Sequence, residues 1–138
     1  DYLDLMDEIT GLMDKPRHAI KSELDSLGQR EVGQITASII RAFLATRLTY
    51  DRSLADVRGV RLLNALQREF PDGIPPNPPL ERLPGSPELR QDPFTGDDLI
   101  VRTSKTSLAI YSVGINGIDD NGSFEKHEDY GFHIELRE

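Results

Sequence analysis

The stretch Asn116-Gly-Ile-Asp-Asp-Asn-Gly-Ser-Phe-Glu125 lies in the last third of the chain, and that third, Asp92 to Glu138, decides the fold. The stretch joins two segments in which apolar and polar residues alternate, a pattern typical of half-buried strands. It also gathers oxygen-bearing side chains and glycines, which a tight cation-binding turn requires. The sequence therefore predicts a loop between two strands that is the best candidate for a binding site.

Three segments of this region have the alternation of β-strands. They run from Leu99 to Thr103, from Leu108 to Val113 and from Phe132 to Leu136. In the last of them Phe132, Ile134 and Leu136 alternate with polar residues, which predicts one buried and one polar face. Three short strands are not stable alone, so helices must cover the sheet.

Four segments before this region have the periodicity of amphipathic helices. They are residues 2–13, a short helix containing Ile20, Leu24 and Leu27, residues 34–49, and a segment from Ser53 to about Phe70. The fourth is expected to begin at Ser53 because Ser53-Leu-Ala-Asp56 resembles a capping box. Three of its arginines are expected to face water: Arg58, Arg61 and Arg68. The buried face of the first helix is expected to consist of Tyr2, Leu5, Met6, Ile9, Leu12 and Met13. That of the third is expected to consist of Ile35, Ile39, Ala42, Phe43 and Thr46. That of the fourth is expected to consist of Val57, Val60, Leu63, Leu66 and Phe70.

The predicted fold is α+β: a helical amino-terminal half of about four helices packed on a three-stranded antiparallel sheet. The 138 residues are expected to form a single domain. Residues 1–70 are its helical part, 71–93 a proline-rich crossover, and 94–138 the small sheet with its acidic loop. Pro75-Pro-Asn-Pro-Pro79 must be extended, and Leu80 and Leu83 are expected to attach the crossover to the core.

Charge and composition exclude several classes of function. The net charge is −8; residues 1–70 carry 10 basic and 11 acidic side chains, whereas residues 71–138 carry 6 and 13. This acidic second half argues against nucleic-acid binding, which requires clustered Lys and Arg. There is no cysteine, which excludes disulfides, zinc-thiolate sites and cysteine nucleophiles.

The loop matches part of the calcium-loop pattern. Counted from Gly117, Asp119 occupies the third position, Asn121 the fifth, Gly122 the sixth and Glu128 the twelfth. The first position is glycine and the flanking segments are strands, so this is no EF-hand. Ca²⁺ is the expected cofactor of the loop, and the alternative is a polar loop that binds nothing.

Catalysis has less support in the sequence. Five loop acids could pair as general acid and base, but acid-rich loops are usually solvated; they are Asp119, Asp120, Glu125, Glu128 and Asp129. His127 has no second histidine at metal-ligand spacing. We therefore expect a protein that is not an enzyme, with a hydrolase using the loop carboxylates as the third alternative.

Three motifs carry a resemblance to a known family: Asp92-Pro-Phe-Thr-Gly96, Ile110-Tyr-Ser-Val-Gly114 and Gly117-Ile-Asp-Asp-Asn-Gly122. In this order they resemble the carboxyl-terminal region of the major pseudopilins of type II secretion, and the end of uncharacterised bacterial membrane-anchored proteins. The resemblance covers about residues 53–138. It implies a pilin-like carboxyl-terminal part with a calcium-binding loop. The residues it implies as calcium ligands or loop-fixing residues are Ser112, Asn116, Asp119, Asp120 and Asp129.

The function expected from this resemblance is a non-enzymatic, extracytoplasmic interaction or assembly domain with a calcium-stabilised loop. Its expected partner is another protein or a second copy, with no nucleic acid. Membrane attachment is expected only through a segment outside this chain, in a membrane-anchored full-length protein. The alternative is a helical adaptor or structural domain with no bound ion.

Overall fold

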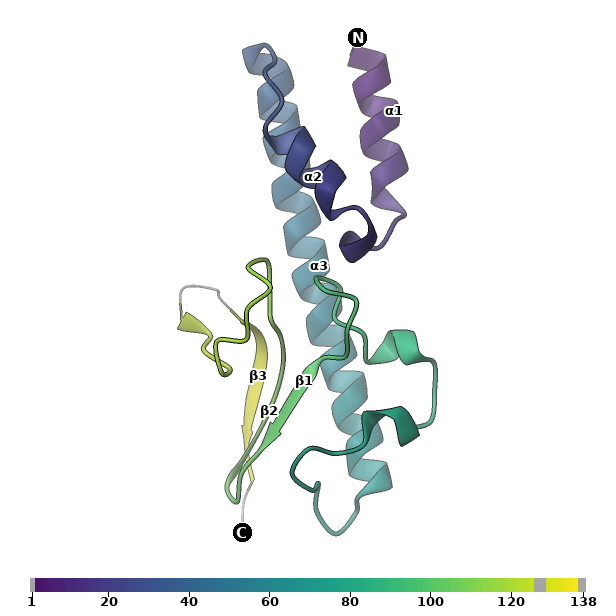
Figure 1. Cartoon of the computed structure of the whole chain (residues 1–138), viewed down its shortest axis with the longest axis vertical. Coiled ribbons are helices and arrows are strands. Elements are labelled where there is room, and N and C mark those ends of the chain that lie inside the picture. The colour runs from purple at the N-terminus through teal and green to yellow at the C-terminus, as the bar shows by residue number, and fades with distance from the viewer. Residues whose placement is uncertain (1, 126–128, 137–138) are drawn as a thin grey trace. The chain divides into compact units, whose positions relative to one another are not determined.

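The computed structural model describes residues 2–125 and 129–136. Three α-helices precede three strands: α1 (Tyr2–Met13), α2 (Lys21–Gly28), α3 (Gln34–Glu69), β1 (Ile100–Thr103), β2 (Ser107–Ser112) and β3 (Tyr130–Glu135) (Figure 1). The predicted α+β class and the three antiparallel strands are confirmed. The described residues form two compact units, a helical unit that ends at Asp51 and a sheet unit that begins at Arg52.

The prediction of two separate helices over residues 34–70 is wrong, because α3 is one helix of 36 residues. No glycine or proline interrupts the segment from Thr49 to Ser53. Asp51 accepts hydrogen bonds from Arg47, one turn earlier in the same helix, so the helical conformation satisfies a carboxylate that is 1% exposed. Ser53 therefore lies inside a helix and does not cap one.

The helical unit has its own hydrophobic core. Leu5, Ile9 and Leu12 of α1 are buried as predicted, but Ile35 is 80% exposed, contrary to the prediction. The face of α3 that is buried here begins one turn later, at Ile40 and Phe43. The full cluster consists of Leu5, Ile9, Leu12, Ile20, Leu24, Leu27, Ile40 and Phe43.

In the sheet unit, β2 is the central strand and pairs with β1 on one side and β3 on the other. The register places Val101 opposite Ile110, and Ile110 opposite Phe132. The core of this unit is built by α3, the crossover and the strands: Leu62, Leu66, Leu83, Leu99, Val101, Leu108 and Ile110. Leu83 is buried and Leu80 packs against this cluster, which confirms that both attach the crossover to the core.

The face of α3 that packs on the sheet agrees with the prediction at Leu63, Leu66 and Phe70 but not at two valines. Val57 and Val60 are each 49% exposed, whereas Ala55 and Leu62 are buried. A Cβ on Gly59 would lie 3.0 Å from the Phe132 ring, so the absence of a side chain there lets helix and sheet approach closely. Periodicity alone favours the valines, because it gives a glycine no weight on the buried face.

Both faces of β2 are buried, and the acidic loop covers one of them. Residues Leu108 to Ser112 are all buried, although only one face of the sheet meets the core that α3 supplies. On the other face, the Phe124 ring packs edge-on against Tyr111, with ring centroids 6.2 Å apart, and against His133 at 4.7 Å. The loop after β2 therefore folds back over the sheet and covers its centre.

Candidate functional site: the carboxylate-braced loop

Asp92 is a buried carboxylate of the sheet unit that accepts three hydrogen bonds. It is 1% exposed, and its Oδ1 accepts hydrogen bonds from the Phe94 amide and the Ser112 hydroxyl, both at 2.8 Å. Its Oδ2 accepts one from the Val113 amide at 3.1 Å. The carboxylate thus ties the turn before β1 to the end of β2, two segments 20 residues apart in the chain.

The surroundings of Asp92 also shift the pKa of its carboxyl. Burial raises the pKa of this carboxyl above its ordinary value, and the hydrogen bonds from Phe94, Ser112 and Val113 offset part of that rise. The positive charge of Arg58 also lowers the pKa of Asp92. Its guanidinium is directed to this turn, where it donates to the Gln91 carbonyl at 2.7 Å. The prediction that Arg58 is a solvated side chain is therefore wrong: a backbone acceptor in the folded turn holds it.

Asp119 is held by a cation and a phenol. Its Oδ2 accepts from Arg102 at 2.6 Å, and its Oδ1 accepts from the Tyr111 hydroxyl and the Asn121 amide, both at 2.9 Å. Burial alone would raise the pKa of Asp119, but these hydrogen bonds, that of Arg102 above all, outweigh it and hold the pKa below its ordinary value. Burial and the hydrogen bond to Asp119 raise the pKa of Tyr111 to about 12. This tyrosine is a neutral donor and no nucleophile at physiological pH.

Asp129 closes the other end of the loop. It is 1% exposed, and its Oδ2 accepts from the Gly122 amide at 2.9 Å. Its own backbone N–H donates to the Ser123 carbonyl at 3.1 Å. Burial raises the pKa of this carboxyl, and the negative charges of Asp120 and Asp119 add to the rise. The strand β3 thus begins where a buried acid fixes the preceding turn.

The tip of the loop is shaped by residues with left-handed backbone. Gly117, Asn121 and Gly122 have φ values of +68°, +61° and +75°, which glycine adopts freely and asparagine tolerates. Asn116 accepts from the Ile118 amide at 3.0 Å and donates to Asp120 at 2.9 Å. These contacts fix the chain path and turn Ile115 and Ile118 outward, with exposed fractions of 50% and 61%.

The structure brings some of the predicted metal ligands together and separates others. Asp120 and Asp129 both brace the loop, but Asp119 pairs with Arg102 on β1, and the hydroxyl of Ser112 donates to Asp92. Glu128 and His127 lie outside the described residues. Within residues 2–125 and 129–136, no group of three or more acidic or histidine side chains could hold a metal ion. Calcium binding by the loop therefore stays a prediction.

Arg52 and Tyr130 were not singled out in the sequence, and Phe94 was quoted only as a member of the turn motif that begins at Asp92. The Arg52 guanidinium lies over the Tyr130 ring, 4.2 Å from its centroid, and the Tyr130 ring stacks on Phe94 at 5.8 Å. This column joins α3, the start of β3 and the turn after Asp92. The sequence signal for it is weak, because its members are 36 to 78 positions apart. Asp92 was quoted as part of a turn motif, but its long-range partners could not be read from the sequence.

The comparisons with known proteins give no relative for this chain. No family model, no curated protein and no solved structure matches it. Among the described residues, no helix has the length and apolarity that crossing a membrane requires.

Proposed function

We propose that the chain is a non-enzymatic interaction or assembly domain of pseudopilin type, in which the braced loop is the contact surface. The observation that carries this proposal is that the loop carboxylates bind groups of the chain itself. Asp119 binds Arg102 and Tyr111, and Asp129 binds backbone amides at the base of the loop. Their charge stabilises one loop conformation, and a loop fixed in this way presents Ile115 and Ile118 in defined positions.

The three motifs behind the pseudopilin resemblance support the same proposal. The first and second are joined by the bonds of Asp92 to Ser112 and Val113. The third is held by Asp119 to Tyr111, a residue of the second motif. Segments that resemble one family in sequence order therefore also form one connected network, which supports a pilin-like sheet. The resemblance alone implies an extracytoplasmic location in a membrane-anchored protein.

A helical adaptor is the second candidate, and exposed apolar residues of the helical unit favour it. Ile35 and Leu3 expose large apolar side chains, and Tyr2 is also exposed.

A hydrolase, the third candidate, would need two carboxylates free to exchange protons with a substrate. Among the described loop acids, Asp119 and Asp129 already accept two or more hydrogen bonds each and Asp120 accepts one from Asn116, which lowers the case for that third candidate.

Cross-linking from single cysteines tests the interaction proposal, because the chain has no cysteine of its own. The variants are Ile118→Cys in the loop, Ile35→Cys in the helical unit, and Lys105→Cys in the exposed turn between β1 and β2 as the control. We expect a maleimide cross-linker to join Ile118→Cys to one discrete protein, either a second copy or a partner, identified by mass spectrometry. The control should give no such product.

Two results would redirect the proposal. A product formed from Ile35→Cys and not from Ile118→Cys would favour the helical adaptor. Equal products from Ile118→Cys and Lys105→Cys would mean random collision and would count against a loop surface.

For the calcium prediction, added Ca²⁺ should raise the melting temperature of the protein. Asp119→Ala combined with Asp120→Ala should abolish this rise. No rise in the unchanged protein would contradict calcium binding.

A further inference from the structure

A hollow of about 370 Å³ lies in the sheet unit, where its hydrophobic core meets the surface. One wall is the last turns of α3 and the turn that follows, and the other is formed by the ends of the strands. Leu63, Phe70 and Ile74 pack against the core cluster but are only partly buried, so the core is open here. The principal lining residues are Leu63, Gln67, Phe70, Ile74, Thr103 and Ile134.

The sequence after α3 explains why the hollow stays open. Pro71-Asp-Gly73 ends the helix, and Gly73 has a φ of +129°, a conformation available to glycine. No atom lies within 4 Å of the position that a Cβ on Gly73 would take. The turn therefore passes beside the core without filling it.

The chemistry of the lining defines what could bind. None of the described side chains that line the hollow is charged, although charged residues make up 29% of the chain. The polar groups are the neutral side chains of Gln67 and Thr103, and the Thr103 hydroxyl makes one long bond of 3.4 Å to the Pro75 carbonyl. A charged group in this place would lose its hydration without gaining a counter-charge.

We propose that this hollow binds a small, uncharged, largely apolar molecule, such as a single alkyl chain bearing a hydroxyl group. Its volume lies near the lower end of the range of about 300–1,000 Å³ typical of small-molecule sites. An apolar lining with a few neutral polar groups is also the usual composition of such sites. This proposal is independent of the proposed function of the loop.

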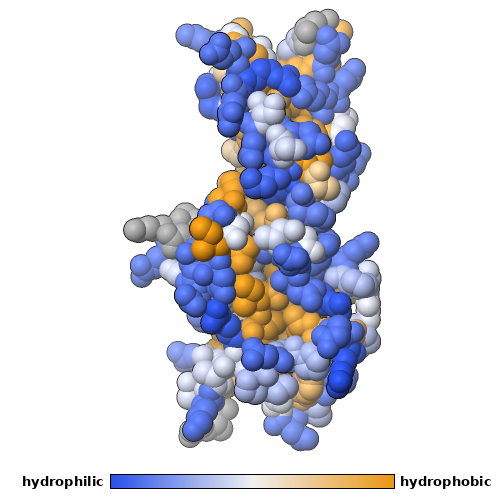
Figure 2. Space-filling model, in the orientation of Figure 1, coloured by the Kyte–Doolittle hydropathy of each residue, from blue (hydrophilic) through white to orange (hydrophobic). Residues whose placement is uncertain are grey.

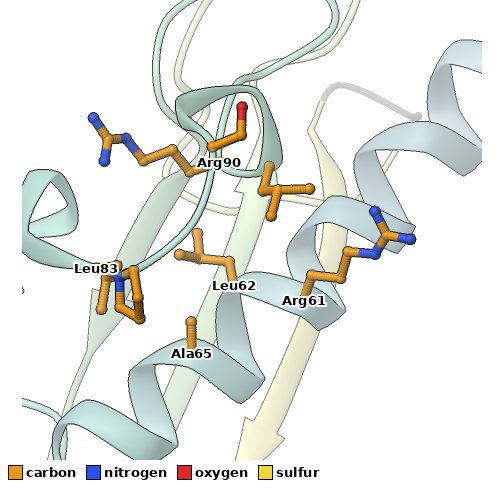
Figure 3. A pocket seen from close by; sticks show the side chains of 8 residues that line it. Arg61, Leu62, Ala65, Leu83 and Arg90 are labelled. Atoms are coloured by element: carbon orange, nitrogen blue, oxygen red, sulfur yellow. The ribbon is translucent and has the colours of Figure 1, made fainter.

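Two other hollows of the described chain fit an apolar ligand less well. The hollow between α3 and the crossover has a volume of about 40 Å³, enough for a few water molecules. Figure 3 shows Leu62, Ala65 and Leu83 around it, with the charged ends of Arg61 and Arg90 directed away. A third, on α2, is lined by polar and charged side chains such as Asp25 and Arg30. Figure 2 shows that apolar residues gather on one face of the sheet unit.

The test uses the neutral fluorescent probe N-phenyl-1-naphthylamine with the whole chain. We expect saturable fluorescence enhancement with one probe per chain, and competition by decanol but not by decanoate. Leu63→Trp, which places a larger side chain in the hollow, should weaken probe binding about tenfold. Val60→Trp, on the exposed face of the same helix, is the matched control and should bind as the unchanged protein does.

Gln67→Glu provides a second variant in case Leu63→Trp does not fold, because Gln67 is on the surface rim. A negative charge there should also weaken probe binding about tenfold, whereas Asn64→Glu on the exposed side of α3 should leave it unchanged. The proposal is overturned by an absence of saturable binding, by equal competition from decanoate, or by variants that bind as the controls do. Dimerisation that Leu63→Trp prevents would assign the hollow to a second copy and would overturn it too.

Discussion

At the scale of single residues, Asp92 is the side chain on which the sheet unit depends most. Replacing it by alanine leaves the Phe94 amide, the Val113 amide and the Ser112 hydroxyl without their acceptor in a buried place. We expect Asp92→Ala to lower the free energy of unfolding by about 3 kcal/mol, measured by urea denaturation. The control is Asp97→Ala, an exposed acid of the same turn, which should cost less than about 0.5 kcal/mol. Equal effects of both variants would contradict the role of Asp92.

The buried acids also predict how stability depends on pH. The pKa values of Asp92 and Asp129 are raised, with burial as the main cause. In the window between the ordinary value of 3.8 and the raised values, the folded state binds more protons than the unfolded state, so the free energy of unfolding falls as pH rises. Asp119, whose pKa is lowered, acts in the opposite sense, and its stabilisation is lost as pH falls through and below 3.8.

The expected result is a stability that increases as the pH falls through the raised pKa values toward 3.8, with a slope that Asp129→Asn reduces. Urea denaturation of the two proteins at a series of pH values above 3.8 measures this difference. Asp97→Asn serves as the control and should keep the slope of the unchanged protein. A slope that Asp129→Asn leaves intact would mean that other groups govern the pH dependence.

At the scale of elements, local pattern predicted the strands well and the helices partly. Alternation of apolar and polar residues identified all three strands, although β2 is buried on both faces. The capping-box pattern at Ser53 failed because a buried ion pair between Arg47 and Asp51 stabilises the helix across that point. The loop was found as a candidate site from its acids and glycines. Its actual partners, Arg102 and Tyr111, could not be found, because they are set by strand register.

Gly59 sets how closely α3 approaches the sheet. A larger side chain would meet the ring of Phe132, which is 3.0 Å from the Cβ position. We expect Gly59→Leu to lower the free energy of unfolding by about 2 kcal/mol, despite the better helix propensity of leucine. Val60→Leu, one position further and exposed, should change it by less than about 0.5 kcal/mol. Urea denaturation distinguishes them, and a stabilised Gly59→Leu would show that the ring moves aside.

At the scale of the whole molecule, the two units have separate hydrophobic clusters although α3 runs through both. The cluster of the helical unit uses residues up to Phe43, and that of the sheet unit begins at Leu62. Arg47 holds the helical unit together at a point where hydrophobic contacts do not. Its guanidinium donates to the Leu12, Met13 and Lys15 carbonyls at the end of α1 and to Asp51.

We therefore expect Arg47→Ala to destabilise one unit selectively. The variant leaves three carbonyls at the end of α1 without this donor, and Asp51 keeps its bond to Arg17; the cost should be about 3 kcal/mol. Hydrogen exchange measured by mass spectrometry should become faster in α1, α2 and the first half of α3, while β1, β2 and β3 keep their protection. Arg41→Ala, an exposed arginine on the same helix, should leave both patterns unchanged. If exchange in the strands accelerates as much as exchange in α1, the two units unfold as one cooperative structure, and the separate clusters do not make separate folding units.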